Sequence, residues 1–330
     1  MSGRIRWGIL GLGNIARKFA EGLQALPEAE LGAVASRSKE KAQAFGGEFG
    51  AARCHASYEA LAEDPAIDAV YVATPHPMHR PNTILCLKAG KAVLCEKPFM
   101  VNRREADEVV AVARAEKRFL MEAMWTRFLP IVVQTRAWIA EGRIGEPRMV
   151  QADFGFRAAI NEDGRLFSPK YAGGGLLDVG VYCVSLAQMV FGEAPDRVTG
   201  LADIGATKVD EQGAMILGYS RGRLAVLSSA VRTNTPQDAV ILGSEGSIRL
   251  HPPFWCGTRA TLSVNGKESE DVTLPYPGNG YTCEAAAVGG CLRAGRLECD
   301  VMPLEETLSI MTTLDRIRAA WGLSYPMDKE

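Results

Sequence analysis

The chain has 330 residues, of which 47% are apolar, 23% charged and 7% aromatic, as in ordinary globular proteins. At roughly 100–200 residues per domain, this length predicts two domains. The formal net charge of -2 provides no broad basic surface for nucleic-acid phosphates or anionic lipids. We therefore expect a small-molecule partner, with no nucleic acid and no membrane.

The 8 cysteines are scattered, without a Cys-x-x-Cys pair or a His and Cys cluster at metal-ligand spacing. This pattern predicts buried free thiols and no metal. The first residues lead directly into an apolar segment without the pattern of a secretory signal. No uninterrupted apolar run approaches the roughly 20 residues that span a bilayer. These features predict a protein of the reducing cytoplasm.

Residues 1–123 alternate short apolar runs with longer helical patterns, which is typical of β-α-β units in a doubly wound parallel sheet. We expect this segment to be one α/β domain. The predicted strands are Arg4–Leu10, Glu30–Ser36, Ala69–Ala73, Ala92–Cys95 and Phe119–Glu122. The predicted helices are Ile15–Leu26, Lys39–Phe45, His79–Ala89, which Gly90 follows as a C-terminal glycine, and Arg103–Glu116.

Residues 124–330 have a different pattern, with strands separated by Gly, Asn and Pro turns. The order predicts an α+β domain in which helices cover one face of a large, mainly antiparallel sheet, and a homodimer would cover the other face. The predicted strands are Met149–Phe156, Arg197–Asp203, Gln212–Tyr219, Arg223–Val231, Asp238–Gly243, Ser247–Leu250, Ala260–Val264 and Ser269–Leu274. The predicted helices are Leu129–Glu141, Leu176–Phe191, Tyr281–Ala294 and Leu304–Trp321.

A Gly-x-Gly-x-x-Ala motif lies between the first predicted strand and the first predicted helix, at Gly11, Gly13 and Ala16. The first glycine permits a tight turn, the second lets a pyrophosphate approach the backbone, and the alanine lets helix and strand pack closely. The helix N-terminus offers N–H groups and a partial positive charge to phosphates. This context predicts a dinucleotide site.

The end of the second predicted strand carries Ser36, Arg37 and Ser38 where an NAD-binding protein usually has a carboxylate for the ribose 2′-OH. A guanidinium between two hydroxyls suits a 2′-phosphate, because arginine offers forked donors to a dianion. We therefore expect NADP(H) rather than NAD(H).

Lys97 follows a predicted parallel strand, at the sheet edge where open α/β folds bind ligands. The preceding strand ends near His76 and His79 on the same edge. These histidines have no carboxylate or thiol partner nearby in the sequence, which favours lining of the cofactor crevice over a metal site.

Together these motifs resemble the glucose–fructose oxidoreductase and inositol dehydrogenase family (Gfo/Idh/MocA). The resemblance spans residues 5 to about 190 and includes Glu96-Lys97-Pro98 and the segment Gly173–Tyr182. Within the family, Leu120–Phe128 is most similar to the dimeric dihydrodiol dehydrogenase group, which includes NADP-dependent D-xylose dehydrogenases.

The resemblance implies an N-terminal Rossmann domain, a C-terminal domain with an open sheet, and hydride transfer between nicotinamide C4 and an alcohol or carbonyl carbon. The implied catalytic residues are Lys97, Asp178 and Tyr182. The implied cofactor-binding residues are Gly11, Gly13, Asn14, Ile15, Ser36, Arg37, Ser38, Thr74, Pro75, His79, Glu96 and Lys97. The implied substrate-binding residues are Trp125, Arg127, Phe154, Asp178 and Tyr182.

This sequence has Tyr182 where most family members carry histidine, and Ser185 where they carry a second aspartate. The dihydrodiol dehydrogenase group shares the tyrosine. Oxidation of an alcohol requires a base for the hydroxyl proton. A free tyrosine titrates near pH ~10, so a nearby ammonium such as that of Lys97 would help Tyr182 to act near neutral pH, and Lys97 could itself be the base. Asp178 lies four positions before Tyr182, on the same helix face.

The leading interpretation is an NADP-dependent oxidoreductase for a cyclic polyhydroxylated substrate, an aldopyranose such as D-xylose or D-glucose, or a trans-dihydrodiol. An inositol, a sugar nucleotide or an imine remain alternative substrates, and an inactive NAD(P)-sensing regulator is an alternative function. Trp125 could be a wall of the pocket or a packing residue. Trp255 is a weaker pocket candidate, for which a loop anchor is the simpler role.

Overall fold

The computed structural model describes residues 3–329, which form two compact units. The first unit comprises the chain up to Phe128 together with Tyr276–Thr307, and the second comprises Leu129–Pro275 together with the chain from Leu308 onward. The boundary predicted at residue 123 therefore lies close to a division of the structure. Residues 276–307, which the sequence analysis assigned to the second domain, pack with the first unit instead.

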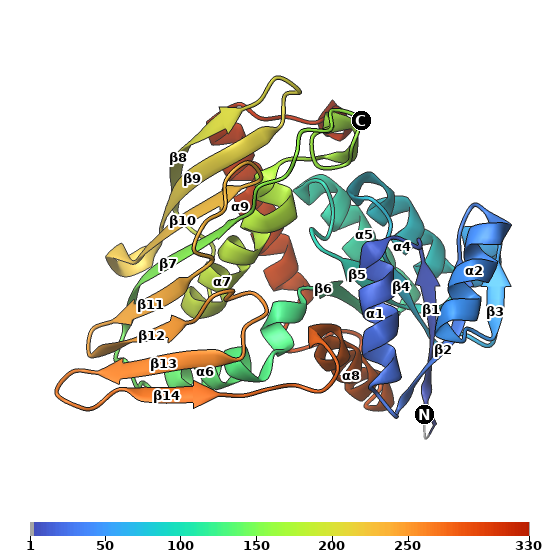
Figure 1. Cartoon of the computed structure of the whole chain (residues 1–330), viewed down its shortest axis with the longest axis horizontal. Helices are drawn as coiled ribbons and strands as arrows, with labels where there is room; N and C mark the ends of the chain where they lie inside the picture. The colour runs from blue at the N-terminus through green and yellow to red at the C-terminus, as the bar shows by residue number, and fades with distance from the viewer. Residues whose placement is uncertain (1–2, 330) are drawn as a thin grey trace. The chain divides into compact units, whose positions relative to one another are not determined.

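The first unit contains a parallel sheet with the strand order β3-β2-β1-β4-β5-β6 (Figure 1). This is the doubly wound order of a dinucleotide-binding fold, and it confirms the predicted class. Apart from the edge strand formed by Arg53–His55, its strands are buried along most of their length, because helices cover both faces of such a sheet. The strands are β1 (Ile5–Leu10), β2 (Ala29–Ala35), β3 (Arg53–His55), β4 (Ala69–Val72), β5 (Ala92–Glu96) and β6 (Leu120–Ala123).

Several helices of the first unit begin at polar caps that the sequence supplies. Ser38 and Asn102 accept backbone N–H groups of Lys41 and Glu105, at 3.2 and 3.0 Å, and so start α2 and α5. The bounds are α1 (Asn14–Gln24), α2 (Lys39–Phe49), α3 (Tyr58–Ala62), α4 (His79–Lys88), α5 (Arg103–Glu116) and α8 (Gly280–Arg293), with 3-10 turns at His76–Met78 and Trp125–Phe128. Among the described elements of residues 3–123, β3, α3 and the 3-10 turn His76–Met78 have no predicted counterpart.

Helix α8 joins the first unit through contacts with α1. The Thr282 hydroxyl donates to the carbonyl of Gly22 at 3.0 Å, and the Asn279 amide donates to the carbonyl of Lys18 at 2.9 Å. The helices approach closely because Gly22 has no side chain, and a Cβ there would lie 2.8 Å from Asn279 Oδ1. These contacts explain why a segment so late in the chain belongs to the N-terminal fold.

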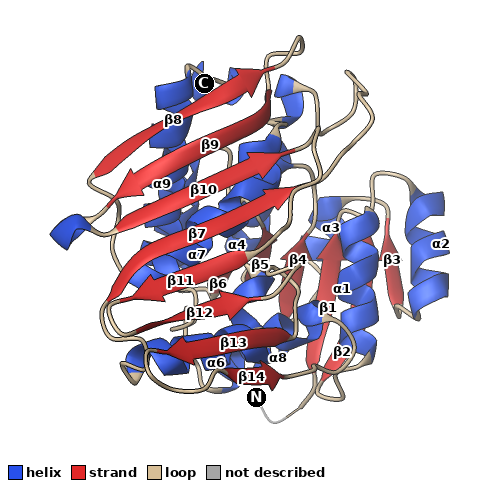
Figure 2. Ribbon diagram, turned by 60° about the vertical axis from the view of Figure 1, so that its left-hand side comes forward, coloured by secondary structure: helices blue, strands red, loops and turns tan. Residues whose placement is uncertain are grey.

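The second unit is built on a sheet with the strand order β14-β13-β12-β11-β7-β10-β9-β8 (Figure 2). Strands β7 and β10 pair in parallel and the other neighbours are antiparallel, which confirms the predicted mainly antiparallel sheet. The strands are β7 (Pro147–Gly155), β8 (Arg197–Ile204), β9 (Asp210–Gly218), β10 (Leu224–Ala230), β11 (Ala239–Gly243), β12 (Gly246–Leu250), β13 (Arg259–Val264) and β14 (Glu270–Thr273).

Helices cover one face of this sheet and leave the other face open (Figure 2). They are α6 (Pro130–Ala140), α7 (Val181–Phe191), which a π-helical turn at Leu176–Gly180 precedes, and α9 (Leu304–Trp321). Short 3-10 turns lie at Pro169–Tyr171, Ser220–Gly222 and Pro326–Lys329. On the open face, Leu201, Ile216 and Val226 of adjacent strands are 84%, 45% and 40% exposed.

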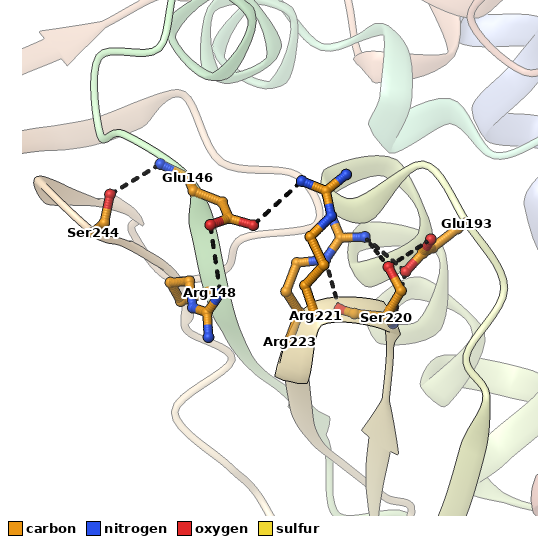
Figure 3. Close-up of polar contacts among 7 residues, drawn as sticks. All are labelled: Glu146, Arg148, Glu193, Ser220, Arg221, Arg223 and Ser244. Atoms are coloured by element: carbon orange, nitrogen blue, oxygen red, sulfur yellow. Dashed lines mark hydrogen bonds and ion pairs between the residues drawn. The ribbon is translucent and has the colours of Figure 1, made fainter.

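A polar network stabilises the end of the sheet where β9 turns into β10 (Figure 3). Arg223 forms a 2.6 Å ion pair with Glu193, which also accepts the N–H of Ser220 at 2.9 Å. In the same turn, Arg221 lies 3.6 Å from the carboxylate of Glu146 on the chain leading into β7. The network therefore connects the turn between β9 and β10 to two other segments of the unit.

Among residues 3–329, the helical stretch Pro169–Phe191 is long and apolar enough to span a membrane by length and composition. Its most apolar 18-residue window is 94% buried within the protein, as expected for a core helix of a folded domain.

Candidate active site

The loop between β1 and α1 has the geometry of a dinucleotide-binding turn. Gly11 has φ +92°, and a Cβ at this position would lie 2.8 Å from the Thr74 side chain. At Gly13, no described atom lies within 4 Å of an added Cβ, so the backbone is open to a ligand. Ala16, in the first turn of α1, is fully buried. Each motif position therefore has the environment that its residue type predicts.

Helix α1 begins at Asn14 without a side-chain cap and without an acidic residue in its first turn, in the part of the chain that the structure describes. Its first N–H groups and the positive end of its dipole are therefore left for an anion. The predicted residues Asn14 and Ile15 lie in this turn. These residues fit the pyrophosphate of a dinucleotide.

The three residues after β2 differ in their contacts and exposure. Ser38 is committed to helix α2, because its hydroxyl accepts the N–H of Lys41 and donates to Glu40 at 2.8 Å. The hydroxyl of Ser36 accepts the N–H of Ser38 at 3.3 Å and is 8% exposed. Arg37 is exposed. Of the three predicted residues, Arg37 is the one that exposes a positive charge at the end of β2.

His79 connects two loops at the carboxyl edge of the parallel sheet. The ring is completely buried, with Nε2 2.8 Å from the carbonyl of Thr74 and Nδ1 3.0 Å from the carbonyl of Pro98. Burial lowers its pKa. Asn82 donates to the Thr74 hydroxyl at 3.2 Å. His79 thus links the backbone of Thr74 to that of Pro98 at this edge of the sheet.

Lys97 follows β5 and is half-buried. Its backbone N–H donates to the Glu96 carboxylate at 3.0 Å. The same carboxylate accepts the hydroxyl of Tyr71, whose pKa burial raises well above its usual value. Tyr71 stacks on Phe19 with ring centroids 3.8 Å apart. Glu96 therefore anchors the backbone of Lys97 to the core of the sheet.

A second buried carboxylate supports the same loop and was not predicted from the sequence. Glu122, at the end of β6, accepts the N–H of Phe99 at 3.1 Å and is completely buried. Burial raises its pKa to about 7. A glutamate inside an apolar strand was the sequence feature that could have indicated this role.

Trp125 and Arg127, predicted to contact substrate, have partners inside the first unit. Trp125 stacks on Tyr281 of α8 with centroids 4.7 Å apart. Arg127 is 3% exposed and lies 2.7 Å from the Glu306 carboxylate. Arg127 is therefore held in an internal ion pair, and Trp125 has the packing role that the sequence left open.

In the second unit, Asp178 and Tyr182 lie on consecutive turns where the π-helical turn passes into α7. Such turns inside helices frequently occur at functional sites. Both side chains are 6% exposed, and Asp178 accepts from the guanidinium of Arg165 at 2.9 Å. Arg165 is itself half exposed. The structure thus adds Arg165 as a partner of the predicted carboxylate.

Aromatic rings surround Tyr182. Phe154 of β7 lies 5.5 Å from it between centroids, and Trp255 lies 6.2 Å away. Phe154 and Trp255 stack nearly parallel at 4.7 Å, and the indole N–H of Trp255 donates to Gln237 at 3.0 Å. The structure therefore brings Phe154 and Tyr182 together as predicted neighbours and places Trp255 with them, although the sequence favoured a loop anchor for Trp255.

Two family models match the chain. A model of an oxidoreductase family with an NAD-binding Rossmann fold matches residues 5–124, and a GFO/IDH/MocA C-terminal domain model matches residues 132–249.

The chain is similar over nearly its whole length to curated enzymes. Trans-1,2-dihydrobenzene-1,2-diol dehydrogenase of Mus musculus is 39% identical over 98% of this chain and 99% of the relative. The Homo sapiens enzyme of the same name is 38% identical with the same coverage.

Solved structures share the complete fold. A 3-ketoreductase from Actinomadura kijaniata, in complex with NADP and TDP-benzene, has a TM-score of 0.86 and 28% identity, covering 97% of this chain and 98% of the reductase. The aldose-aldose oxidoreductase from Caulobacter crescentus has a TM-score of 0.88 at 24% identity, covering 96% and 97% of the two chains.

Proposed function

Because the chain belongs to the GFO/IDH/MocA family of oxidoreductases, in which it is an NAD(P)-dependent dehydrogenase acting on CH–OH groups, we propose that it uses NADP(H) and a cyclic substrate with adjacent hydroxyls. The observation that carries the proposal is the position of Tyr182, one helical turn after Asp178 and beside Phe154 and Trp255.

The first unit is the cofactor-binding domain in this proposal. The turn at Gly11 and Gly13 and the first N–H groups of α1 hold the pyrophosphate. Thr74, Pro75 and Glu96-Lys97 form the adjoining edge of the sheet, which His79 supports. Arg37 binds the 2′-phosphate, because no carboxylate follows β2 to accept a free ribose hydroxyl.

The second unit binds the substrate and supplies an acid–base group. When bound, NADP(H) would supply the hydride chemistry of nicotinamide C4. Tyr182 takes the proton from the reacting hydroxyl during oxidation and returns it during reduction. For a tyrosine to act near neutral pH, its phenolate requires about 4 kcal/mol of preferential stabilisation, and Lys97 is the candidate ammonium from the sequence. Asp178, held by Arg165, accepts a second substrate hydroxyl.

The stacked rings of Phe154 and Trp255 favour a small ring as substrate, because a flat apolar wall matches the face of an aldopyranose or of a dihydrodiol. The relatives are named for a trans-dihydrodiol, which makes such diols the first substrates to test. D-xylose and D-glucose are the matching sugars.

We also propose a homodimer of the cytoplasm. Leu201, Ile216 and Val226 form an exposed apolar patch on the open sheet face, as expected for a surface that a second copy covers. The cysteines of the described chain are free, which agrees with a reducing compartment.

The test is the absorbance change at the reduced-nicotinamide band with NADP+ and a panel of trans-dihydrodiols, pentoses, hexoses and inositols. Tyr182→Phe should lower kcat by about 10²–10⁴-fold on the best substrate while NADPH binding stays intact, because the ring stays and only the proton donor is removed. Near-normal turnover of this variant would transfer the acid–base role to Lys97. No turnover with any member of the panel would contradict the proposed substrate class.

A further inference from the structure

We propose that Asp210 is a positioning residue for the helix that carries Asp178 and Tyr182. The inference rests on the proposed function, because it treats that helix as the one with the acid–base group. Asp210 is the first residue of β9 and lies 34 positions from its principal partner, Leu176.

The Asp210 carboxylate accepts hydrogen bonds from backbone N–H groups at the start of the helix. Oδ2 accepts the backbone N–H of Leu176 at 2.6 Å, and the N–H of Gly175 also donates to the carboxylate. These N–H groups are orphan donors, because the first turn of a helix has no earlier carbonyls for them. A carboxylate at this end is also favoured by the helix dipole. Asp210 therefore acts as a cap supplied by a distant strand.

The Asp210 carboxylate lies close to the glycines that precede the helix. Gly174 has φ +108°, and a Cβ there would lie 2.0 Å from Asp210 Oδ1. At Gly173, an added Cβ would lie 2.6 Å from the carbonyl oxygen of Leu166. Only glycine permits the backbone at Gly174 to pass this close to the carboxylate, whereas a Cβ at Gly175 would meet Oδ2 at an ordinary 3.4 Å.

The same loop is fixed from a second direction. The Tyr325 hydroxyl donates to the carbonyl of Gly173 at 2.6 Å and is buried. The guanidinium of Arg318 lies over the Tyr325 ring at 5.1 Å and forms a 2.6 Å ion pair with Asp328. With Asp210 on the N–H groups and Tyr325 on a carbonyl, the entry to the helix has a single arrangement.

This arrangement determines where the proposed site residues lie. Asp178 and Tyr182 follow Leu176 by two and six positions, within the first turns of the helix. A shift or rotation of the helix start therefore moves both side chains relative to Phe154 and Trp255. Asp210 is completely buried, and its Oδ1 has no hydrogen-bond partner among the described residues, so the hydrogen bonds that this carboxylate accepts from other residues come from the helix start.

The experiment is a double-mutant cycle with Asp210→Asn, Tyr182→Phe and the double variant of the full-length enzyme. Asp210→Asn should lower kcat by about 10–100-fold, the cost of a small misplacement of a reacting group. Its Kd for NADPH should stay within about twofold of the wild-type value. In the Tyr182→Phe background, Asp210→Asn should cause no further loss of kcat, because the group that it positions is already gone. Asp203→Asn, at an exposed carboxylate of neighbouring β8, is the matched control and should keep wild-type kcat.

Tyr325→Phe removes the hydrogen bond to the carbonyl of Gly173. This variant replaces Asp210→Asn in the experiment if Asp210→Asn does not fold. It should lower kcat by a smaller factor, again only when Tyr182 is present. Wild-type kcat in Asp210→Asn, or an equal loss of kcat with and without Tyr182, would overturn this inference but not the proposed role of Tyr182. Normal turnover of Tyr182→Phe by itself would overturn both the inference and the proposed role of Tyr182.

Discussion

In the proposed function, the choice between the two nicotinamide cofactors depends on Arg37. It is exposed directly after β2, whereas the adjacent Ser38 already caps α2. We expect Arg37→Ala to weaken NADPH binding at least about tenfold, because a charge-assisted contact to the 2′-phosphate is lost. NADH binding should change little. Fluorescence titrations with both cofactors measure the two effects.

The matched control is Arg53→Ala, at an exposed arginine of neighbouring β3. This variant should keep the wild-type preference for NADPH. Equal losses of NADPH and NADH affinity in Arg37→Ala would contradict the assigned role.

Glu122 makes the stability of the protein depend on pH. Burial raises its pKa to about 7, above the ordinary value that the carboxyl has in the unfolded chain. The native state therefore favours the protonated form, so this group stabilises the fold below pH ~4.5 and its contribution is lost as the pH rises through ~7. We expect the loss to amount to about 3 kcal/mol.

Glu122→Gln should remove this part of the pH dependence, since a neutral amide cannot ionise and its oxygen can still accept the N–H of Phe99. Urea unfolding of wild type and variant at pH 5 and pH 8 measures the difference. The exposed Glu116→Gln of α5 is the control. A free energy of unfolding that falls with pH as steeply in Glu122→Gln as in wild type would refute this account.

At the scale of elements, the contact between α1 and α8 depends on the absence of a side chain at Gly22. An added Cβ would lie 3.1 Å from the backbone nitrogen of Thr282, in addition to its short approach to Asn279. We expect Gly22→Ala to destabilise the protein by about 1–3 kcal/mol, because overpacking pushes two helices apart.

Gly47→Ala is the matched control, since Gly47 lies inside α2 with no described atom near its added Cβ. There the alanine should stabilise the helix by about 0.5–1 kcal/mol. Chemical denaturation of both variants gives the comparison, and equal effects of the same sign would contradict the packing argument.

Most elements were predictable because apolar periodicity follows burial. The strand predicted at Ala69–Ala73 is observed at Ala69–Val72, and the helix predicted at Arg103–Glu116 has those ends. The three-residue strand β3 is too short to show a period, and α3 depends on a cap from Ser57, whose hydroxyl accepts the N–H of Ala60.

The candidate site was predictable where a motif is local in the chain. Gly11, Gly13 and Lys97 became candidates because of their spacing to a predicted strand, and they follow β1 and β5 in the structure. Asp210 was missed because its partner is 34 positions away. Arg127 was predicted to face substrate, since nothing local in the sequence indicates its ion pair with Glu306. The periodicity of apolar residues does not indicate which polar groups pair with each other when they are far apart in the sequence.

At the scale of the whole molecule, the open face of the second sheet predicts the oligomeric state. We expect sedimentation at micromolar concentration to give twice the 35.6 kDa chain mass. Ile216→Lys should yield a monomer, because a charge in the middle of the apolar patch opposes burial. Val133→Lys on α6, at a valine with the same 45% exposure, should remain dimeric. A wild-type protein that sediments only as a monomer would contradict the proposed dimer.

The interleaving of the two units has a consequence for biosynthesis. Proteins emerge from the ribosome N-terminus first, and a domain generally folds as a unit once its residues are available. The first unit needs Tyr276–Thr307, so α8 cannot dock on α1 until nearly the whole chain has been translated. The first unit therefore cannot complete its fold earlier than the second, although most of it is translated first. Both units complete their cores at the end of synthesis.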